Sequence, residues 1–357
     1  MSDCPEYWKT TLEEIDQQMI GVRKGKRRIL CVSPGGRPVY AVFYGKENQI
    51  NRTANLSSAL GAGDPSCFVN RKADTWRPTL LLAGCIHGGE FEGTAALLNL
   101  ISVMENGADL AGDTYTVLLS KLHQINLLIL PCVNPDGRSH VPFATMVGRS
   151  FEELRYYNQG TWPDGSLCGW PECKKIHPIK GKVGYLGGYF NDDGINLMHD
   201  NFFGKKAAET EALLQVTEAY APDFAVLLHG GTNGISHLLA PTYAPPAIAE
   251  EVIRVGDAMR RRCLAEDLPF LGTKSGGEDL DPPASFNLIS AMYHLCGAPC
   301  ITYDSNQGLT DGETDVSMTH PQIYRQHWVL FETLCDHLLR KINDEKIENT
   351  EQGGDVN

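Results

Sequence analysis

The chain has 357 residues, of which 42% are hydrophobic and 21% are charged. This composition is typical of a folded globular protein and excludes a mainly disordered chain. The 31 Lys and Arg residues and 44 Asp and Glu residues give a formal charge of −13, which argues against nucleic acid or an anionic membrane as the main partner. The longest apolar stretches, Leu80–Ile86 and Leu127–Val133, are too short to span a bilayer.

The N-terminus reads MSDCPEYWKT and lacks a basic start followed by an apolar run. We therefore expect no secretory signal and a cytoplasmic protein. The 11 cysteines are scattered through apolar segments, which favours reduced core residues over a disulfide framework. The alternative for Cys168, Cys173 and His177, which fall in one loop, is a metal site, but no fourth ligand is evident in the sequence.

The first half of the chain combines helical spacing with apolar runs that are typical of strands buried on both faces. In chain order, the patterns predict a helix within Glu6–Val22, a hairpin of Arg28–Ser33 and Pro38–Tyr44, a buried strand at Thr79–Gly84, a helix at about Phe91–Met104 and a buried strand at Ile125–Pro131.

The second half begins with the segment Arg149–Asn191, in which no helix or strand pattern persists. A loop this long inside a compact domain is usually functional. Beyond it the patterns predict helices at Ala207–Ala221, Pro246–Leu264, Ala284–Leu295 and His320–Lys341, and strands at Phe224–His229 and Pro299–Tyr303. This alternation predicts one α/β domain over residues 1–342, followed by a disordered acidic tail at 343–357.

The candidate functional residues lie where predicted strands end. Thr79–Gly84 leads into His87 and Glu90, whose spacing at a helix start allows both side chains to point to one face. The strand Phe224–His229 brings His229 to a second carboxyl end, where ligands of open α/β sheets commonly lie. Imidazole and carboxylate suit Zn²⁺, and a catalytic zinc typically has three protein ligands. Each histidine alone is better explained as a cap or a core residue, but the set favours a metal site.

These motifs resemble the zinc carboxypeptidase family. The ordered motifs that carry the resemblance are Ser33-Pro34-Gly35-Gly36-Arg37-Pro38, His87-Gly88-Gly89-Glu90, Asn134-Pro135-Asp136-Gly137, His229, Ser275-Gly276-Gly277 and His320-Pro321-Gln322-Ile323. The resemblance implies that His87, Glu90 and His229 bind one Zn²⁺. It also implies a single α/β domain with a mixed, mainly parallel sheet of about eight strands and helices on both faces.

The catalytic base departs from the family pattern. Relatives have a Glu near the end of a late strand in a Thr-x-Glu pattern, whereas this chain has Asp304 in Ile301-Thr302-Tyr303-Asp304. Aspartate is one methylene shorter, so it must lie closer to the water whose proton it takes. We expect Asp304 to be the base, with Glu278 and Glu313 as the alternatives.

Substrate recognition departs as well. Met198 and His199 stand where relatives have an Asn-Arg pair that binds a terminal carboxylate, and neither replaces the guanidinium fork. Asn196 stands where relatives have an Asp that orients a ligand histidine. His199 should therefore supply no fixed positive charge near pH 7 unless its pKa is raised.

Three further cations are candidates for the site. Arg149 follows the Asn-Pro-Asp-Gly turn at the spacing of the family's carbonyl-polarising arginine, a group that stabilises a developing oxyanion, and Arg155 is the nearby alternative. Lys274 is a possible anion-binding residue, although a solvated lysine is the simpler interpretation.

The sequence thus predicts a zinc-dependent hydrolase that cleaves an amide bond in a peptide or small amide substrate. One alternative is an acylase or deacylase of the same fold that acts on a small N-acyl metabolite. The other is a zinc-binding or metal-free protein that has lost catalysis and serves as a binding module.

Overall fold

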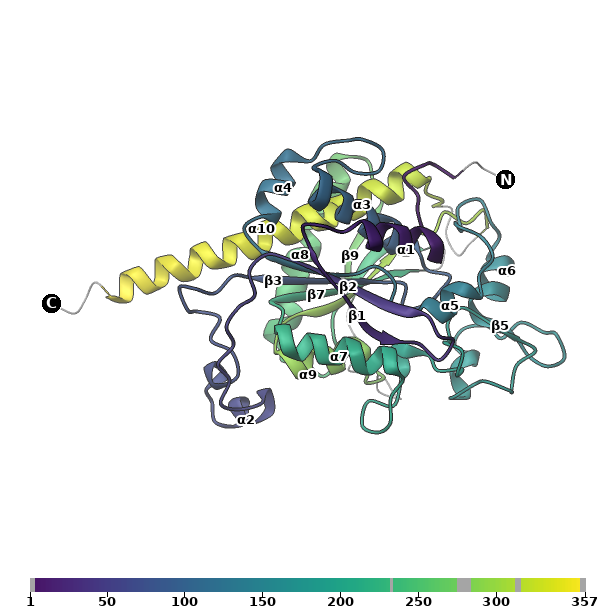
Figure 1. Cartoon of the computed structure of the whole chain (residues 1–357), viewed down its shortest axis with the longest axis horizontal. Coiled ribbons are helices and arrows are strands. Elements are labelled where there is room, and N and C mark those ends of the chain that lie inside the picture. The colour runs from purple at the N-terminus through teal and green to yellow at the C-terminus, as the bar shows by residue number, and fades with distance from the viewer. Residues whose placement is uncertain (1–3, 232–233, 275–283, 312–315, 354–357) are drawn as a thin grey trace.

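The computed structural model describes residues 4–231, 234–274, 284–311 and 316–353, with the backbone alone for 342–353. Its centre is an eight-stranded sheet with the order β1-β2-β4-β3-β7-β10-β8-β9 (Figure 1). The strands are β1 (Lys26–Val32), β2 (Pro38–Tyr44), β3 (Thr79–Gly84), β4 (Asn126–Leu130), β7 (Phe224–Gly230), β8 (Ser236–Leu239), β9 (Phe270–Lys274) and β10 (Cys300–Ser305), with a separate pair β5 (Gly160–Thr161) and β6 (Tyr185–Leu186).

The sheet is mixed, and its centre is parallel. Strands β4, β3, β7 and β10 are parallel to their neighbours in this order, whereas the β1–β2 hairpin, the β2–β4 pair and the β10–β8 pair are antiparallel. The expected single α/β domain with a mixed, mainly parallel sheet is confirmed.

Helices cover both faces of the sheet (Figure 1). One face packs against α1, α3, α4, α8 and α10, and the other packs against α7 and α9. The helices are α1 (Leu12–Gly21), α2 (Leu56–Gly61), α3 (Glu92–Asn106), α4 (Thr116–Leu122), α5 (Pro135–Ser139), α6 (Phe151–Leu154), α7 (Ala208–Tyr220), α8 (Pro246–Ala265), α9 (Leu288–Cys296) and α10 (His320–Gly353), with short turns η1 (Pro65–Cys67), η2 (Arg155–Gln159), η3 (Glu172–Lys175) and η4 (Leu197–His199).

The continuous apolar run of β3 follows from this double cover. Leu80 and Leu82 pack with the helices on one face, and Leu81 and Ala83 pack with those on the other. Every residue of β3 is buried. Because side chains of a strand alternate between faces, a central strand with both faces covered is apolar throughout.

Several element bounds differ from the sequence predictions. Strand β10 extends to Ser305, so Asp304 lies inside the strand and not after it. Strands β8 and β9 were not predicted, because their short runs mix apolar and polar residues. The helix α10 continues past the expected end at Lys341 into the segment 343–357 that we predicted to be a disordered tail. Glu and Lys in that segment have good helix propensity, which favours propagation of an existing helix.

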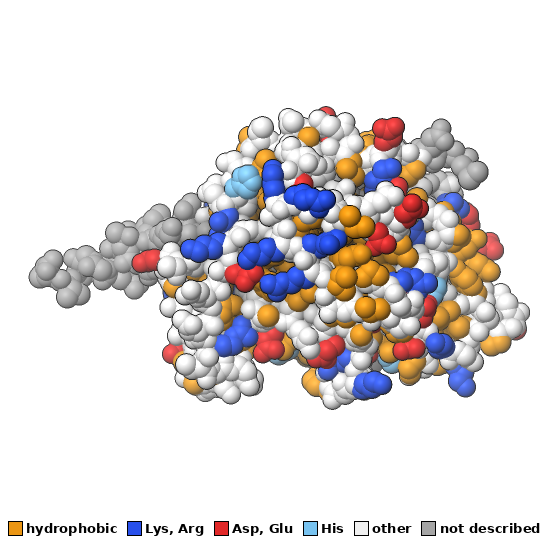
Figure 2. All heavy atoms as spheres, viewed as in Figure 1, with side chains coloured by type: hydrophobic (Ala, Val, Ile, Leu, Met, Phe, Trp, Pro, Cys, Tyr) orange, Lys and Arg blue, Asp and Glu red, His pale blue; other side chains and the backbone are white. Residues whose placement is uncertain are grey.

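The distribution of charged side chains on the surface and the burial of the cysteines are those of a folded domain. Cations and anions are interspersed on the face shown in Figure 2, where apolar side chains also gather; Ile29 and Val32 of the edge strand β1 are exposed. The cysteines are free, and most of them are buried, as expected for core residues. No helix of the described residues is long and apolar enough to cross a bilayer.

Candidate metal centre

The centre lies at the carboxyl ends of the two adjacent parallel strands β3 and β7. Gly84, the last residue of β3, pairs with Leu228, so His229 lies beside the point where β3 ends. Cys85 follows β3 with φ 55°, an uncommon conformation for a residue with a side chain. The chain then turns through His87 and Glu90 before α3 begins at Glu92. Strand order therefore brings together ligands that are far apart in the sequence.

His87, Glu90 and His229 are buried, and one ligand atom from each lies within 4.8 Å of the others. The Glu90 carboxylate lies between the two imidazoles. Its Oε1 is 2.9 Å from Nδ1 of His87, and its Oε2 is 2.7 Å from Nδ1 of His229. Burial alone would raise the pKa of Glu90, but the two histidines hold it at about 2. Burial alone would lower the pKa of His229, but Glu90 raises it.

The donor set fits a metal ion. Nε2 of His87 lies 3.2 Å from Oδ1 of Asn196, and this oxygen also accepts a hydrogen bond from the backbone N–H of Met198. Because an amide oxygen only accepts, Nε2 of His87 carries a hydrogen. In neutral His87 the Nδ1 lone pair then faces the carboxylate oxygen of Glu90. Two electron-rich atoms at this distance need a cation between them, either a second ring proton or a metal.

Asn196 therefore makes the contact with His87 that the family resemblance implies for an Asp at this position. The residue caps η4, and its side chain is buried. Its Nδ2 has no partner among the described residues. The contact selects the tautomer of His87 that leaves Nδ1 free for a metal.

The glycine after His87 is required by close packing. A Cβ on Gly88 would come within 1.9 Å of the Gly137 carbonyl carbon, so the loop that carries His87 lies directly against the Asn-Pro-Asp-Gly turn. That turn is fixed in its place because the buried Asp136 accepts hydrogen bonds from Ser33 at 2.5 Å and Arg37 at 2.7 Å. The distant sequence motifs thus form one continuous support for the metal ligands.

Asp304 lies on the strand next to His229. The two residues are direct partners in the parallel β7–β10 pair. On its other side Asp304 pairs with His237 of β8, whose Nε2 is 3.5 Å from the Asp304 carboxylate. Burial raises the pKa of Asp304, and Glu90 adds to this effect, whereas His229 and His237 oppose it. A partly buried carboxylate whose pKa is raised, on the strand beside His229, is suited to proton transfer.

The predicted cations have different surroundings. Arg149 is engaged elsewhere, because its guanidinium pairs with Glu153 at 2.8 Å and covers the Phe143 ring at 3.5 Å. Arg155 lies against Gly169 in the long loop. Lys274 ends β9 and is exposed. Burial lowers the pKa of His237, and the charge of Lys274 acts in the same direction.

The alternative bases Glu278 and Glu313, and the Ser275-Gly276-Gly277 motif, lie outside the described residues.

The long loop brings residues to the site that the sequence did not single out. The Tyr189 ring stacks on His87 with a centroid distance of 3.9 Å. Trp170 lies 5.7 Å from Tyr189 and 6.2 Å from His199, centroid to centroid. Lys174 places its ammonium 3.4 Å from the centroid of the Trp170 ring. The only sequence signal was the length of this loop, which carries no periodicity that ranks its residues.

His199 itself is neutral near pH 7. Burial lowers its pKa to about 3, and the charges of Lys174, His87 and His229 act in the same direction. That His199 supplies no fixed positive charge to a substrate stays a prediction. The structure adds Lys174 as a cation beside it.

Two other regions do not form a second metal site or extend this one. Cys168 and Cys173 are packed in an apolar cluster with Ile179 and Phe190, and the groups of metal-ligating side chains that converge in the described part of the chain do not include them.

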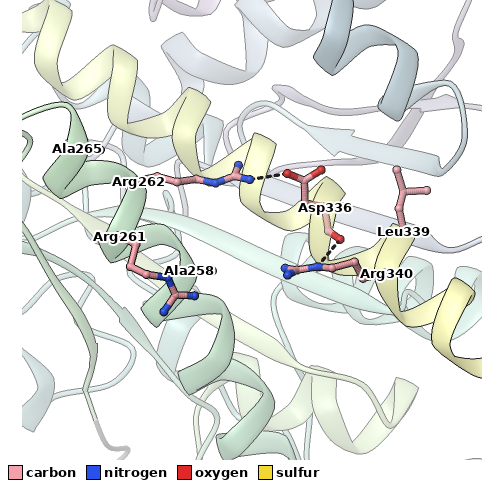
Figure 3. Close-up of a pocket in the computed structure, with 7 residues that line it drawn as sticks. All are labelled: Ala258, Arg261, Arg262, Ala265, Asp336, Leu339 and Arg340. Atoms are coloured by element: carbon pink, nitrogen blue, oxygen red, sulfur yellow. Dashed lines mark hydrogen bonds and ion pairs between the residues drawn. The ribbon is translucent and has the colours of Figure 1, made fainter.

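A pocket of about 470 Å³ lies between α8 and α10 and is lined by Arg261, Arg262, Asp336 and Arg340, among others (Figure 3). It lies far from the metal ligands, because the neighbouring His337 contacts Phe224 at the opposite end of β7 from His229.

The fold and the buried His-Glu-His cluster define a metallocarboxypeptidase-like α/β protein. The chain resembles zinc carboxypeptidases in sequence as well, since the family model described as zinc carboxypeptidase matches residues 28–162. A search of curated proteins finds no match.

Solved structures support the same fold. A metallo-carboxypeptidase from Burkholderia cenocepacia is 14% identical with a TM-score of 0.57, and the match covers 91% of this chain and 68% of that one. Carboxypeptidase A from Helicoverpa armigera is 14% identical with a TM-score of 0.55, covering 94% and 76%. Bovine thrombin-activatable fibrinolysis inhibitor, solved in complex with tick carboxypeptidase inhibitor, is 12% identical with a TM-score of 0.53, covering 94% and 100%. At these identities the likeness establishes the fold.

Proposed function

We propose that the protein is a zinc-dependent hydrolase that cleaves an amide or peptide bond. The observation that carries this proposal is the convergence of His87, Glu90 and His229 within 4.8 Å, with the carboxylate of Asp304 on the adjacent strand. Three protein ligands of this kind are typical of a catalytic zinc site with an open position. The family match and the shared fold support the same class of reaction.

Each residue of the site has a chemical task in this proposal. His87, Glu90 and His229 would hold the ion, which when bound supplies a Lewis acid for the carbonyl and lowers the pKa of water. Asp304 takes a proton from the attacking water and returns it to the nitrogen of the leaving amine. Asn196 holds the His87 ring in the orientation that faces Glu90. Tyr189 covers the His87 ring and limits access of bulk water from that side.

Hydrolysis of a panel of N-acetylated dipeptides tests the proposal. We expect turnover by zinc-loaded protein, its loss on treatment with a chelator and its recovery on addition of zinc. The variant His229→Ala should bind less zinc and show no turnover, while Asp193→Asn, an acidic side chain away from the cluster, should behave as wild type.

The products separate the candidate activities. Release of a free amino acid supports a peptidase, whereas release of a small carboxylic acid from the N-acyl end supports an acylase. Zinc-loaded protein that hydrolyses no amide of either kind would support the binding-module alternative.

A further inference from the structure

The pocket between α8 and α10 lies outside the metal centre, and the proposed function does not use it (Figure 3). Residues three and four apart share one face of a helix, so a regular stripe of each helix faces the gap between them. The short side chains of two alanines leave room there, and the pocket has a volume of about 470 Å³. Its lining includes Ala258, Arg261, Arg262 and Ala265 of α8 and Asp336 and Arg340 of α10.

The pocket has an excess of positive charge, although the whole chain has a formal charge of −13. Three guanidiniums line it together with one carboxylate, that of Asp336. Both oxygens of this carboxylate are engaged, because Oδ2 accepts a hydrogen bond from Arg262 and Oδ1 pairs with Lys121 at 2.6 Å. Arg340 donates from Nε to the backbone carbonyl of Asp336 at 3.1 Å, and not to its carboxylate. Within the described part of the chain, neither Arg261 nor Arg340 forms an ion pair with a carboxylate.

These two guanidiniums come from opposite walls of the pocket. Arg261 belongs to α8, whereas the side chain of Arg340 extends from α10 toward α8 (Figure 3). A guanidinium presents its N–H groups as a planar fork that matches two oxygens of a phosphate. A doubly charged phosphate group between the two walls would therefore find a partner on each of them.

The remaining lining indicates the other part of such a ligand. Ala258, Ala265 and Leu339 give the pocket apolar wall next to the arginines. Its volume falls in the range of about 300–1,000 Å³ that is typical of small-molecule sites, so an organic group has room beside the phosphate. A phosphate monoester above pH 7 carries nearly two negative charges and meets both requirements.

We propose that the pocket between α8 and α10 is a binding site for a small phosphate monoester. Arg261 and Arg340 hold the phosphate, and the apolar wall contacts the organic group. Arg262 keeps its ion pair with Asp336, which joins the two helices. The inference goes beyond the proposed function and does not depend on it, because the pocket lies far from the metal ligands.

Binding of phenyl phosphate to the full-length chain tests this site. Calorimetry at about pH 7.5 and physiological salt gives the Kd, and prior treatment with a chelator excludes a metal ion as the phosphate partner. We expect phenyl phosphate to bind about tenfold more tightly than benzoate, which has the same ring and a single charge. Arg261→Met and Arg340→Met should each weaken the binding of phenyl phosphate by about tenfold. Arg340→Lys keeps the charge without the fork and should lose less affinity.

Arg260→Met is the matched control on the same helix. The Arg260 side chain faces β9, since its Cδ lies 3.9 Å from the position of a Cβ on Gly272. Removal of this charge should leave the Kd unchanged, and the Tm of each variant checks that it is folded.

Three results would overturn the inference. The first is that wild type does not bind phenyl phosphate more tightly than benzoate. The second is that folded Arg261→Met and Arg340→Met bind it as wild type does. The third is that Arg260→Met weakens binding as much as they do, because the attraction would then come from the general charge of the helix. A failure of amide hydrolysis would bear on the proposed function alone.

Discussion

At the scale of single residues, the decisive features are the proposed base, Asp304, and the tautomer of His87, the first of the proposed metal ligands. Asp304 is shorter than the glutamate expected from the family resemblance, but it lies inside β10 as the direct partner of His229. The strand pairing itself holds the carboxylate near the metal ligands. Its shorter side chain is thus combined with a position fixed by backbone hydrogen bonds, which reduces the entropy cost of placing this carboxylate.

Removal of the charge of Asp304 should stop proton transfer and leave the metal in place. We expect Asp304→Asn to retain zinc and to lower kcat by about 10²–10⁴-fold, with a much smaller change in KM. Asp304→Glu keeps a carboxylate and should retain more activity than Asp304→Asn. Zinc content by elemental analysis and steady-state kinetics on a hydrolysed dipeptide measure these effects. Near-normal kcat in Asp304→Asn with zinc bound would shift the assignment to Glu278 or Glu313.

Asn196 should act on metal affinity through the ring of His87. We expect Asn196→Ala to weaken zinc binding by about 10–100-fold, because the His87 tautomer is no longer fixed. Asn196→Asp restores a stronger acceptor of the same shape and should bind zinc at least as tightly as wild type. Competition with a chromogenic chelator gives the affinities. Asn201→Ala, at an exposed position nearby, is the matched control; equal zinc affinity of Asn196→Ala and wild type would contradict the role.

At the scale of elements, α7 and the long loop are joined by a buried carboxyl group. Glu209 in the first turn of α7 is fully buried and accepts hydrogen bonds from the Asn191 amide, at the end of the loop, at 3.2 and 3.3 Å. Burial raises the pKa of Glu209 to about 7 from the ordinary value of 4.5. This contact anchors the loop that carries Trp170, Lys174 and Tyr189, so loop position and helix packing depend on the same group.

The raised pKa makes stability depend on pH with a defined sign. Protonated Glu209 stabilises the fold fully below about pH 4.5, and this contribution is lost as the pH rises through about 7. Wild type and Glu209→Gln should therefore be similarly stable at pH 5. At pH 8 the variant should be more stable, by about 2 kcal/mol in the free energy of unfolding. Urea unfolding at both pH values measures the difference.

A matched position checks this result. Glu211 lies in the same turn of α7 but is exposed, so Glu211→Gln should show no such pH-dependent gain. If wild type and Glu209→Gln keep the same difference in stability at pH 5 and pH 8, Glu209 titrates as an ordinary surface carboxylate.

At the scale of the whole molecule, the proposed metal ligands link two central strands of the sheet. His87 and Glu90 follow β3, while His229 belongs to β7. One ligand atom from each residue converges with the others only when these strands are paired. The folded state therefore has a site that the unfolded chain lacks, and binding of zinc should stabilise the fold.

The expected stabilisation follows from mass action. With free zinc at 100 times its Kd, the free energy of unfolding should rise by about 2.7 kcal/mol. We expect a clear increase in Tm for wild type on addition of zinc and a much smaller one for His229→Ala. Differential scanning calorimetry with and without a chelator measures both. An equal Tm increase in the two proteins would mean that zinc binds elsewhere.

The sequence by itself determined the features that depend on local patterns. Continuous apolar runs located β3, β4 and β7, because a strand covered on both faces must be apolar at every position. With those strands placed, their carboxyl ends identified His87, Glu90 and His229. The motifs also indicated the fold class, because they follow one another along the chain in the order found in the family that the chain resembles.

Tertiary structure alone decided which segments lie next to each other. The pairing of β10 with β7 fixes the place of Asp304, and the course of an aperiodic loop brings Lys174 and Trp170 beside His199. Neither follows from a local pattern, because strand order depends on long-range pairing, and a loop without periodicity does not mark which of its residues face inward. The surroundings of His199 therefore depend on contacts between segments that the sequence does not relate to one another.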